Sequence, residues 1–146
     1  MGAPLLANYQ PGLLYPPNWL YFILAAIGGI PTLAWGMSLL VAAHLAWAAI
    51  GMAFLARRLG LGILAQIISG LAFGLSGYLV ARAGFLSINA SVAWVPWVIL
   101  GVISLGEDVP NFNLLSICVG LQLLAGHAQT SWYTLILAGM WAMFWG

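Results

Sequence analysis

The stretch from Thr32 to Arg58, TLAWGMSLLVAAHLAWAAIGMAFLARR, decides the fold of this chain. It carries no charge before its last two residues, and it is longer than the roughly 20 apolar residues that a helix needs to cross a bilayer. A basic pair followed by Gly60 is typical of a helix C-terminus, because arginines favour that end of the helix dipole and glycine suits the cap. We therefore predict a membrane-spanning helix that ends at Arg57–Arg58.

The rest of the chain has the same character. Of its 146 residues, 3% are charged and 64% are hydrophobic, whereas a soluble domain is typically about one quarter charged. The charges fall at Arg57–Arg58, Arg82 and Glu107–Asp108, with apolar runs between them. So few charges cannot cover a folded surface in water. The sequence predicts an all-α integral membrane protein with about five transmembrane helices and one short interfacial helix.

The turn residues divide the chain. Prolines make residues 1–18 an irregular loop, predicted on the outer face. Residues 19–30, which end near Gly28–Gly29, are too short to span and are predicted to form the interfacial helix. Residues 31–146 are predicted to form a helical membrane bundle with spans at about 32–56, 63–82, 88–105, 111–125 and 130–145.

Two local features bear on how these spans pack. Pro96 predicts a kink in the third span. Gly70, Gly74 and Gly77 recur at helical spacing in the second span. Small residues at this spacing let membrane helices approach closely, so we predict that this face packs against another helix.

The arginines also predict sidedness. Basic residues concentrate on the cytoplasmic side of membrane proteins, which places Arg57–Arg58 inside. Alternation of five spans then puts Glu107–Asp108 inside and the polar turn at His127 outside. Several polar side chains come to this outer face and are the candidate binding residues: Gln10, Tyr15, Asn18, Arg82, His127 and Gln129.

Each candidate has two interpretations. Arg82 suits the phosphate of a lipid-linked substrate, because guanidinium matches phosphate oxygens in a fork; it equally suits an interfacial anchor that reaches the lipid headgroups. His127 could bind a hydroxyl-rich substrate or exchange a proton, or it could satisfy backbone at a helix break. His44 lies in the middle of the first span, where it is either functional or bonded to a neighbouring helix.

Other functions are excluded by what the sequence lacks. A net charge of +1 with no lysine argues against nucleic acid as a partner. Two histidines, one cysteine and two adjacent carboxylates leave no metal site, and we predict no cofactor. Since no nucleophile, base and acid can be assembled on the outer face, no catalytic residue is predicted.

Five segments, in their order and spacing, resemble the YfhO-like family of bacterial integral membrane proteins: PLLANYQPGLLYPPN, HLAWAAIGMAFLARRLGLG, GLSGYLVARAGFLSINA, AWVPWVIL and QLLAGHAQTSWYTLIL. That family looks like part of the GT-C glycosyltransferase superfamily. The resemblance implies a multi-pass protein of the bacterial cytoplasmic (inner) membrane that takes a sugar from a polyprenyl-phosphate carrier on the outer face. It implies the same candidate binding residues, which fall in the matching segments.

The sequence also departs from the family. Family members are longer and carry an acidic outer-loop motif that supplies the expected base, and a histidine is expected where Phe85 stands. We therefore expect an incomplete fragment, a partial GT-C-like bundle that is not catalytic alone. The alternative is a small accessory subunit of a larger membrane complex, which would pack against partner helices with lipid, quinone or pigment between them.

Overall fold

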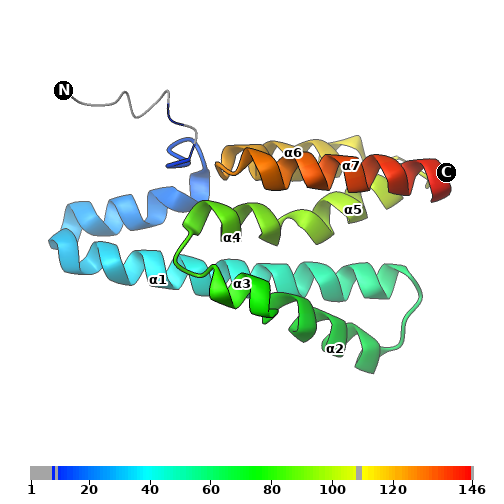
Figure 1. Cartoon of the computed structure of the whole chain (residues 1–146), viewed down its shortest axis with the longest axis horizontal. Coiled ribbons are helices and arrows are strands. Elements are labelled where there is room, and N and C mark those ends of the chain that lie inside the picture. The colour runs from blue at the N-terminus through cyan, green and yellow to red at the C-terminus, as the bar shows by residue number, and fades with distance from the viewer. Residues whose placement is uncertain (1–7, 9, 108–109, 146) are drawn as a thin grey trace.

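The computed structural model describes Asn8, residues 10–107 and residues 110–145. Most of the predicted loop before residue 10, and Asp108, lie outside the described residues. Every regular element in the described part is a helix (Figure 1). The elements are η2 (Pro16–Asn18), α1 (Trp19–Arg58), α2 (Ile63–Gly74), α3 (Gly77–Ala81), α4 (Leu86–Ala93), α5 (Val95–Ser104), α6 (Phe112–Leu124) and α7 (Ala128–Trp145).

Helix α1 is a hairpin of two limbs, residues 19–28 and 32–58, that reverses at Gly29 (Figure 1). Gly29 has φ of +75°, a conformation that glycine adopts without strain. The Thr32 hydroxyl donates to the Leu24 carbonyl oxygen at 2.7 Å and ties the limbs together. At Gly36 an added Cβ would lie 2.8 Å from the Cβ of Tyr21, so a side chain there would push the limbs apart.

The second limb of α1 packs against α2 through two glycines. A Cβ at Gly70 would lie 2.7 Å from the carbonyl oxygen of Ala49, and one at Gly74 would lie 2.8 Å from that of Leu45. The predicted close packing is therefore confirmed at these two positions, where backbone meets backbone. It does not extend to Gly77, around which a Cβ would meet nothing within 4 Å.

Two apolar segments are interrupted where the chain changes direction. Leu75 and Ser76 separate α2 from α3, and the Ser76 hydroxyl oxygen accepts from the backbone N–H of Leu79 as a helix cap. The sequence predicted one continuous span here, so this break is a correction. Trp94 separates α4 from α5, and Pro96 stands in the first turn of α5. The kink predicted at Pro96 thus lies at Trp94, two residues earlier, because proline is well accommodated in the first turn of a helix.

Helix α5 lies at the centre and contacts α1, α6 and α7. Its Val98 and Ile99 are buried, and Cys118 of α6 belongs to the same apolar cluster. On the side facing α1, the rings of Trp47 and Trp97 stack with centroids 4.3 Å apart. These contacts hold the second limb of α1, α5 and the α6–α7 pair in one bundle.

Three segments are long and apolar enough to cross a membrane among the described residues: Pro16–Arg58, Ile63–Ala81 and Leu86–Ser104. They indicate a membrane protein. Helix α6, with 13 residues, is shorter than the length at which a helix can span.

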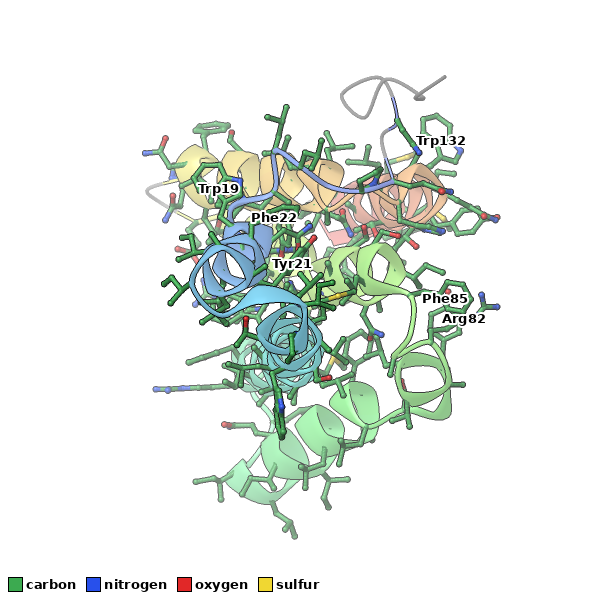
Figure 2. The ribbon with its side chains drawn as sticks, turned by 90° about the vertical axis from the view of Figure 1, so that its left-hand side faces the viewer. Trp19, Tyr21, Phe22, Arg82, Phe85 and Trp132 are labelled. Atoms are coloured by element: carbon green, nitrogen blue, oxygen red, sulfur yellow. The ribbon has the colours of Figure 1, made fainter. Side chains whose placement is uncertain are left out.

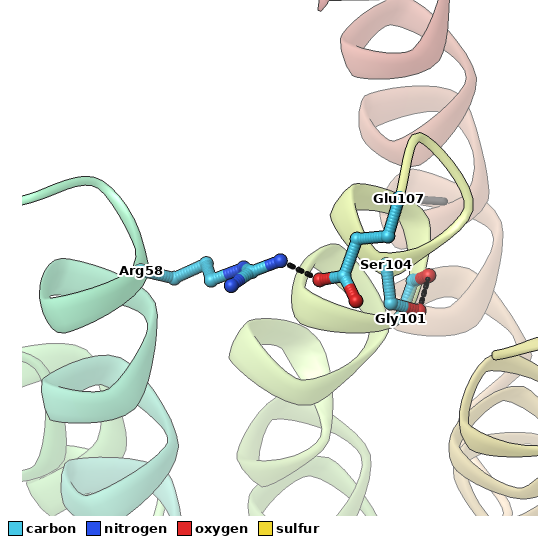
Figure 3. A network of polar contacts seen from close by, with 4 residues as sticks. All are labelled: Arg58, Gly101, Ser104 and Glu107. Carbon is cyan, nitrogen blue, oxygen red and sulfur yellow. Dashed lines mark hydrogen bonds and ion pairs between the residues drawn. The ribbon is translucent and has the colours of Figure 1, made fainter. Parts of the chain in front are cut away.

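The turns gather at two levels of the bundle (Figure 1). The arginine end holds the α1–α2 and α5–α6 turns, and there Arg58 forms an ion pair with Glu107 (Figure 3). The polar end holds residues 10–18 and the α3–α4 and α6–α7 turns. This grouping is the one that alternation of the helices predicts.

Candidate functional site

The N-terminal segment, residues 10–18, lies against the end of α6. A Cβ at Gly12 would lie 3.4 Å from the Ala125 carbonyl oxygen, and Gly12 has φ of +55°. The side-chain amide of Asn18 donates to the Gly12 carbonyl oxygen at 3.0 Å. Asn18 is 6% exposed, so its amide serves this turn rather than facing outward.

Tyr15 anchors the segment to two helices. Its hydroxyl oxygen lies 2.8 Å from Nε2 of His44 on α1, and it accepts from the indole N–H of Trp94 at 2.8 Å. Tyr15 is fully buried. Its three-way contact joins residues that are 29 and 79 positions apart in the chain.

The series of hydrogen bonds runs from Trp94 through Tyr15 and His44 to the Leu40 carbonyl oxygen. Its two end groups fix which atom donates in each bond. Nδ1 of His44 lies 2.8 Å from the Leu40 carbonyl oxygen, which can only accept, so Nδ1 carries the proton. Nε2 then accepts from the Tyr15 hydroxyl, and the hydroxyl oxygen accepts from Trp94. The imidazole is neutral in this arrangement. Burial raises the pKa of Tyr15 to about 12, despite the opposing effect of the Trp94 hydrogen bond, so the phenol remains a proton donor near neutral pH.

A cavity of about 230 Å³ lies beside these hydrogen bonds. Its lining includes Leu40 and Trp47, together with the bonded side chains of Tyr15, His44 and Trp94. Its wall is almost entirely apolar, because the polar atoms of Tyr15 and His44 are used by one another. The arrangement holds the N-terminal segment in place. It offers no free group for proton transfer.

His127 begins α7. Its Nδ1 accepts from the backbone N–H of Thr130 at 3.2 Å and lies 2.6 Å from the Thr130 hydroxyl oxygen. It therefore satisfies backbone at the helix break, one of the two roles that the sequence leaves open. Since Nδ1 accepts, the neutral ring carries its proton on Nε2. Within the described part of the chain Nε2 has no hydrogen-bond partner, so it is left as a donor.

Gln10 and Gln129 are both exposed at this end. The side-chain amide of Gln129 donates to the Tyr133 hydroxyl at 2.7 Å, one turn along α7. The backbone N–H of Gln10 donates to the side-chain oxygen of Asn8 at 3.2 Å. The Gln10 amide itself remains available.

Arg82 caps α3 at the edge of the polar end. Its guanidinium carbon lies 5.7 Å from the ring centroids of both Tyr78 and Phe85, a cation–π geometry. Asn89 orders the turn by donating to the Arg82 carbonyl oxygen at 2.7 Å. Figure 2 shows Arg82 and Phe85 together on one side of this view, apart from Trp19 on the other. The described carboxylate, Glu107, lies at the opposite end.

The six predicted residues are only partly brought together. Tyr15 and Asn18 share the N-terminal segment, and Gly12 seats that segment beside the α6–α7 turn of His127. Arg82 belongs to a separate turn, and no described contact joins it to His127. All six lie at the polar end.

Sequence reasoning missed a buried polar cluster between α4, α6 and α7. The amide of Gln122, 1% exposed, donates to the Ser91 carbonyl oxygen and to the Thr134 hydroxyl, both at 2.9 Å. The Asn89 side-chain oxygen and the Ser91 hydroxyl are buried with no partner among the described residues. A glutamine inside the apolar run of α6 was the available signal.

No described group of three His, Cys, Asp or Glu gathers closely enough to hold a metal ion. No protein-family model, curated protein or solved structure matches this chain.

Proposed function

We propose that this chain is a multi-pass protein of the bacterial cytoplasmic membrane, a partial GT-C-like and YfhO-like bundle of about five spans. It binds a polyprenyl-phosphate sugar at the polar end, which faces outward, and it contributes to glycosyl transfer without being catalytic alone. The observation that carries the proposal is Arg82. It is the one cation in the sequence between residues 59 and 146, and it stands at the polar end, where the sequence places no carboxylate.

The surroundings of Arg82 suit a phosphate attached to a lipid. Tyr78 and Phe85 are 53% and 57% exposed, so they hold the guanidinium while presenting apolar surface beside it. The fork of N–H groups would bind the phosphate oxygens. The first isoprene units of the carrier would lie along the two rings.

The remaining candidates divide into two roles. His127 through Nε2, Gln129 and Gln10 would hydrogen-bond the sugar hydroxyls from the α7 and N-terminal side of the polar end. Tyr15 and Asn18 would position the N-terminal segment, because their polar atoms are already engaged. Glu107 is paired with Arg58 at the far end. The acid or base for sugar transfer would therefore come from outside these residues.

Replacing Arg82 with glutamine should weaken binding of polyprenyl phosphate about tenfold or more, because a hydrogen bond to a charged group contributes about 1.5–3 kcal/mol. Native mass spectrometry of the protein in detergent, titrated with polyprenyl phosphate, measures this. Tyr133→Phe at the polar end keeps all three arginines, so it is the control and should bind this ligand normally. Equal binding by Arg82→Gln and the unsubstituted protein would assign Arg82 to membrane anchoring instead.

The sidedness can be tested with two exposed glycines. Gly62 lies in the α1–α2 turn and Gly84 in the α3–α4 turn, and a Cβ at either meets nothing within 4 Å. Cys118 is buried, so the background is low. In intact cells a membrane-impermeant maleimide should label Gly84→Cys, whereas Gly62→Cys should react only after permeabilisation. The reverse pattern would place Arg82 in the cytoplasm and exclude the proposed transfer site.

A second candidate, an accessory subunit of a larger complex, is favoured by the outer face of α2. Only 17% of the Ile63–Ala81 window is buried, compared with 61% for Leu86–Ser104. Ile63, Leu64 and Leu71 are among the exposed side chains there. A stoichiometric protein partner that co-purifies in mild detergent would support this role. Purification of the chain alone with bound polyprenyl lipid would support the first.

A further inference from the structure

A second pocket lies at the arginine end, away from the proposed sugar site. It encloses about 470 Å³ between the last turn of α1, α5 and the start of α6. Arg57, Arg58 and Glu107 line its polar side, and Phe54, Trp97 and Leu114 are on its apolar side. Charge and apolar surface therefore face the same space.

Among the described residues, this pocket carries two arginines and one carboxylate. Arg58 is paired with Glu107 (Figure 3), and Arg57 has no carboxylate partner among the described residues. The Ser104 hydroxyl donates to the Gly101 carbonyl oxygen at 2.6 Å, so it is not a competing donor in the pocket. Arg57 is thus left as the cationic donor for an anion.

The apolar side is built from rings and branched chains. The rings of Phe54 and Trp97 lie with centroids 5.8 Å apart, and Leu114 comes from α6. This surface could cover several methylene groups of a ligand. A molecule that satisfies both sides must carry an anionic head and a hydrocarbon chain.

The expected position of the pocket relative to the membrane surface indicates which of these molecules it binds. Paired arginines at the end of an apolar helix mark the level of the lipid headgroups. We propose that the pocket binds one anionic phospholipid, with its phosphate on Arg57 and an acyl chain along Phe54, Trp97 and Leu114. The Arg58–Glu107 pair closes one side of the site by linking α1 to the α5–α6 turn.

The test uses purified protein in detergent with phosphatidylglycerol or phosphatidylcholine added at equal concentration. Native mass spectrometry should show at least a tenfold preference for phosphatidylglycerol in the unsubstituted protein. Arg57→Gln should abolish that preference, and Tyr133→Phe at the polar end, which keeps all three arginines, should retain it. An unchanged preference in Arg57→Gln, or equal binding of the two lipids to the unsubstituted protein, would overturn the proposal.

A second variant covers the case in which Arg57→Gln does not fold. Leu114→Trp keeps both arginines and fills the apolar side, so it should lose the bound lipid while circular dichroism shows unchanged helix content. Inorganic phosphate alone should not raise the melting temperature, whereas phosphatidylglycerol should. Retention of the lipid by Leu114→Trp, or an equal rise with phosphate, would show that the acyl chain takes no part and would overturn the site as described.

Discussion

Replacing Gly74 with leucine should separate α2 from α1 and lower the melting temperature by roughly 10 °C. A Cβ at this position would lie 2.6 Å from the Cβ of Ala49 and 2.8 Å from the Leu45 carbonyl oxygen. Neither atom is at the end of a flexible side chain, so the helices themselves must move. Forced overpacking typically costs about 1–3 kcal/mol, and about 3 kcal/mol corresponds to a shift on the order of 10 °C in a chain of this size.

Gly77 provides the matched control for Gly74. It lies three residues further on, and an added Cβ there meets nothing within 4 Å. Gly77→Leu should melt within a few degrees of the unsubstituted protein, as followed by tryptophan fluorescence in the same detergent. Equal losses in both variants would mean that leucine acts through helix propensity, and the close α1–α2 approach would not be what Gly74 supports.

Replacing Tyr15 with phenylalanine should release the N-terminal segment from the bundle. The substitution leaves the indole N–H of Trp94 and Nε2 of His44 without a partner. A buried polar group left unpaired costs about 1–3 kcal/mol. Limited proteolysis should then cut within residues 10–18 at least several times faster, while the helices stay protected.

A double-mutant cycle separates this bond from general packing. If the hydroxyl acts through His44, Tyr15→Phe and His44→Leu should together destabilise the protein by less than the sum of the two single effects, with a coupling of about 1 kcal/mol. Tyr133→Phe removes an exposed hydroxyl whose hydrogen bond among the described residues is with Gln129, so the stability of this variant should hardly change. Strict additivity of Tyr15 and His44 would contradict the hydrogen-bonded chain.

The helical class and the main turns were predictable because they depend on local composition. Glycine and proline mark the helix end near Gly29, and charged or polar residues mark the turns at Arg57–Arg58, Arg82 and His127. The sequence predicted an interfacial helix over residues 19–30, and it did not predict that this segment folds back along the second limb of α1. The break at Leu75–Ser76 was missed, since its neighbours are as apolar as those in a continuous helix. Only a serine that caps α3 distinguishes it.

The contacts of the candidate site were much less predictable. Tyr15 meets His44 and Trp94 only because the α1 hairpin and α4 bring them together, and no spacing in the sequence encodes a separation of 79 residues. Tyr15 was predicted to bind substrate together with Gln10 and Arg82 because all three are polar. Tyr15 is instead buried, and its hydroxyl holds the N-terminal segment in place. Gln122 was overlooked for the converse reason, since its partners are a backbone carbonyl of α4 and a hydroxyl of α7.

The α1 hairpin extends beyond the polar end (Figure 1). Ala83 and Gly84 of the α3–α4 turn share a pocket with Met37 and Ser38, while Ile27 and Ile30 at the hairpin tip are 81% and 82% exposed. At 1.5 Å per residue the tip stands about 12 Å further along the helix axis than Ser38. On the proposed topology, the apolar tip would lie among lipid chains, whereas Arg82 would sit at the level of the headgroups. This geometry predicts a bilayer that is locally thinned beside the α3–α4 turn, so that a lipid-borne phosphate would reach Arg82 at a depression in the membrane surface.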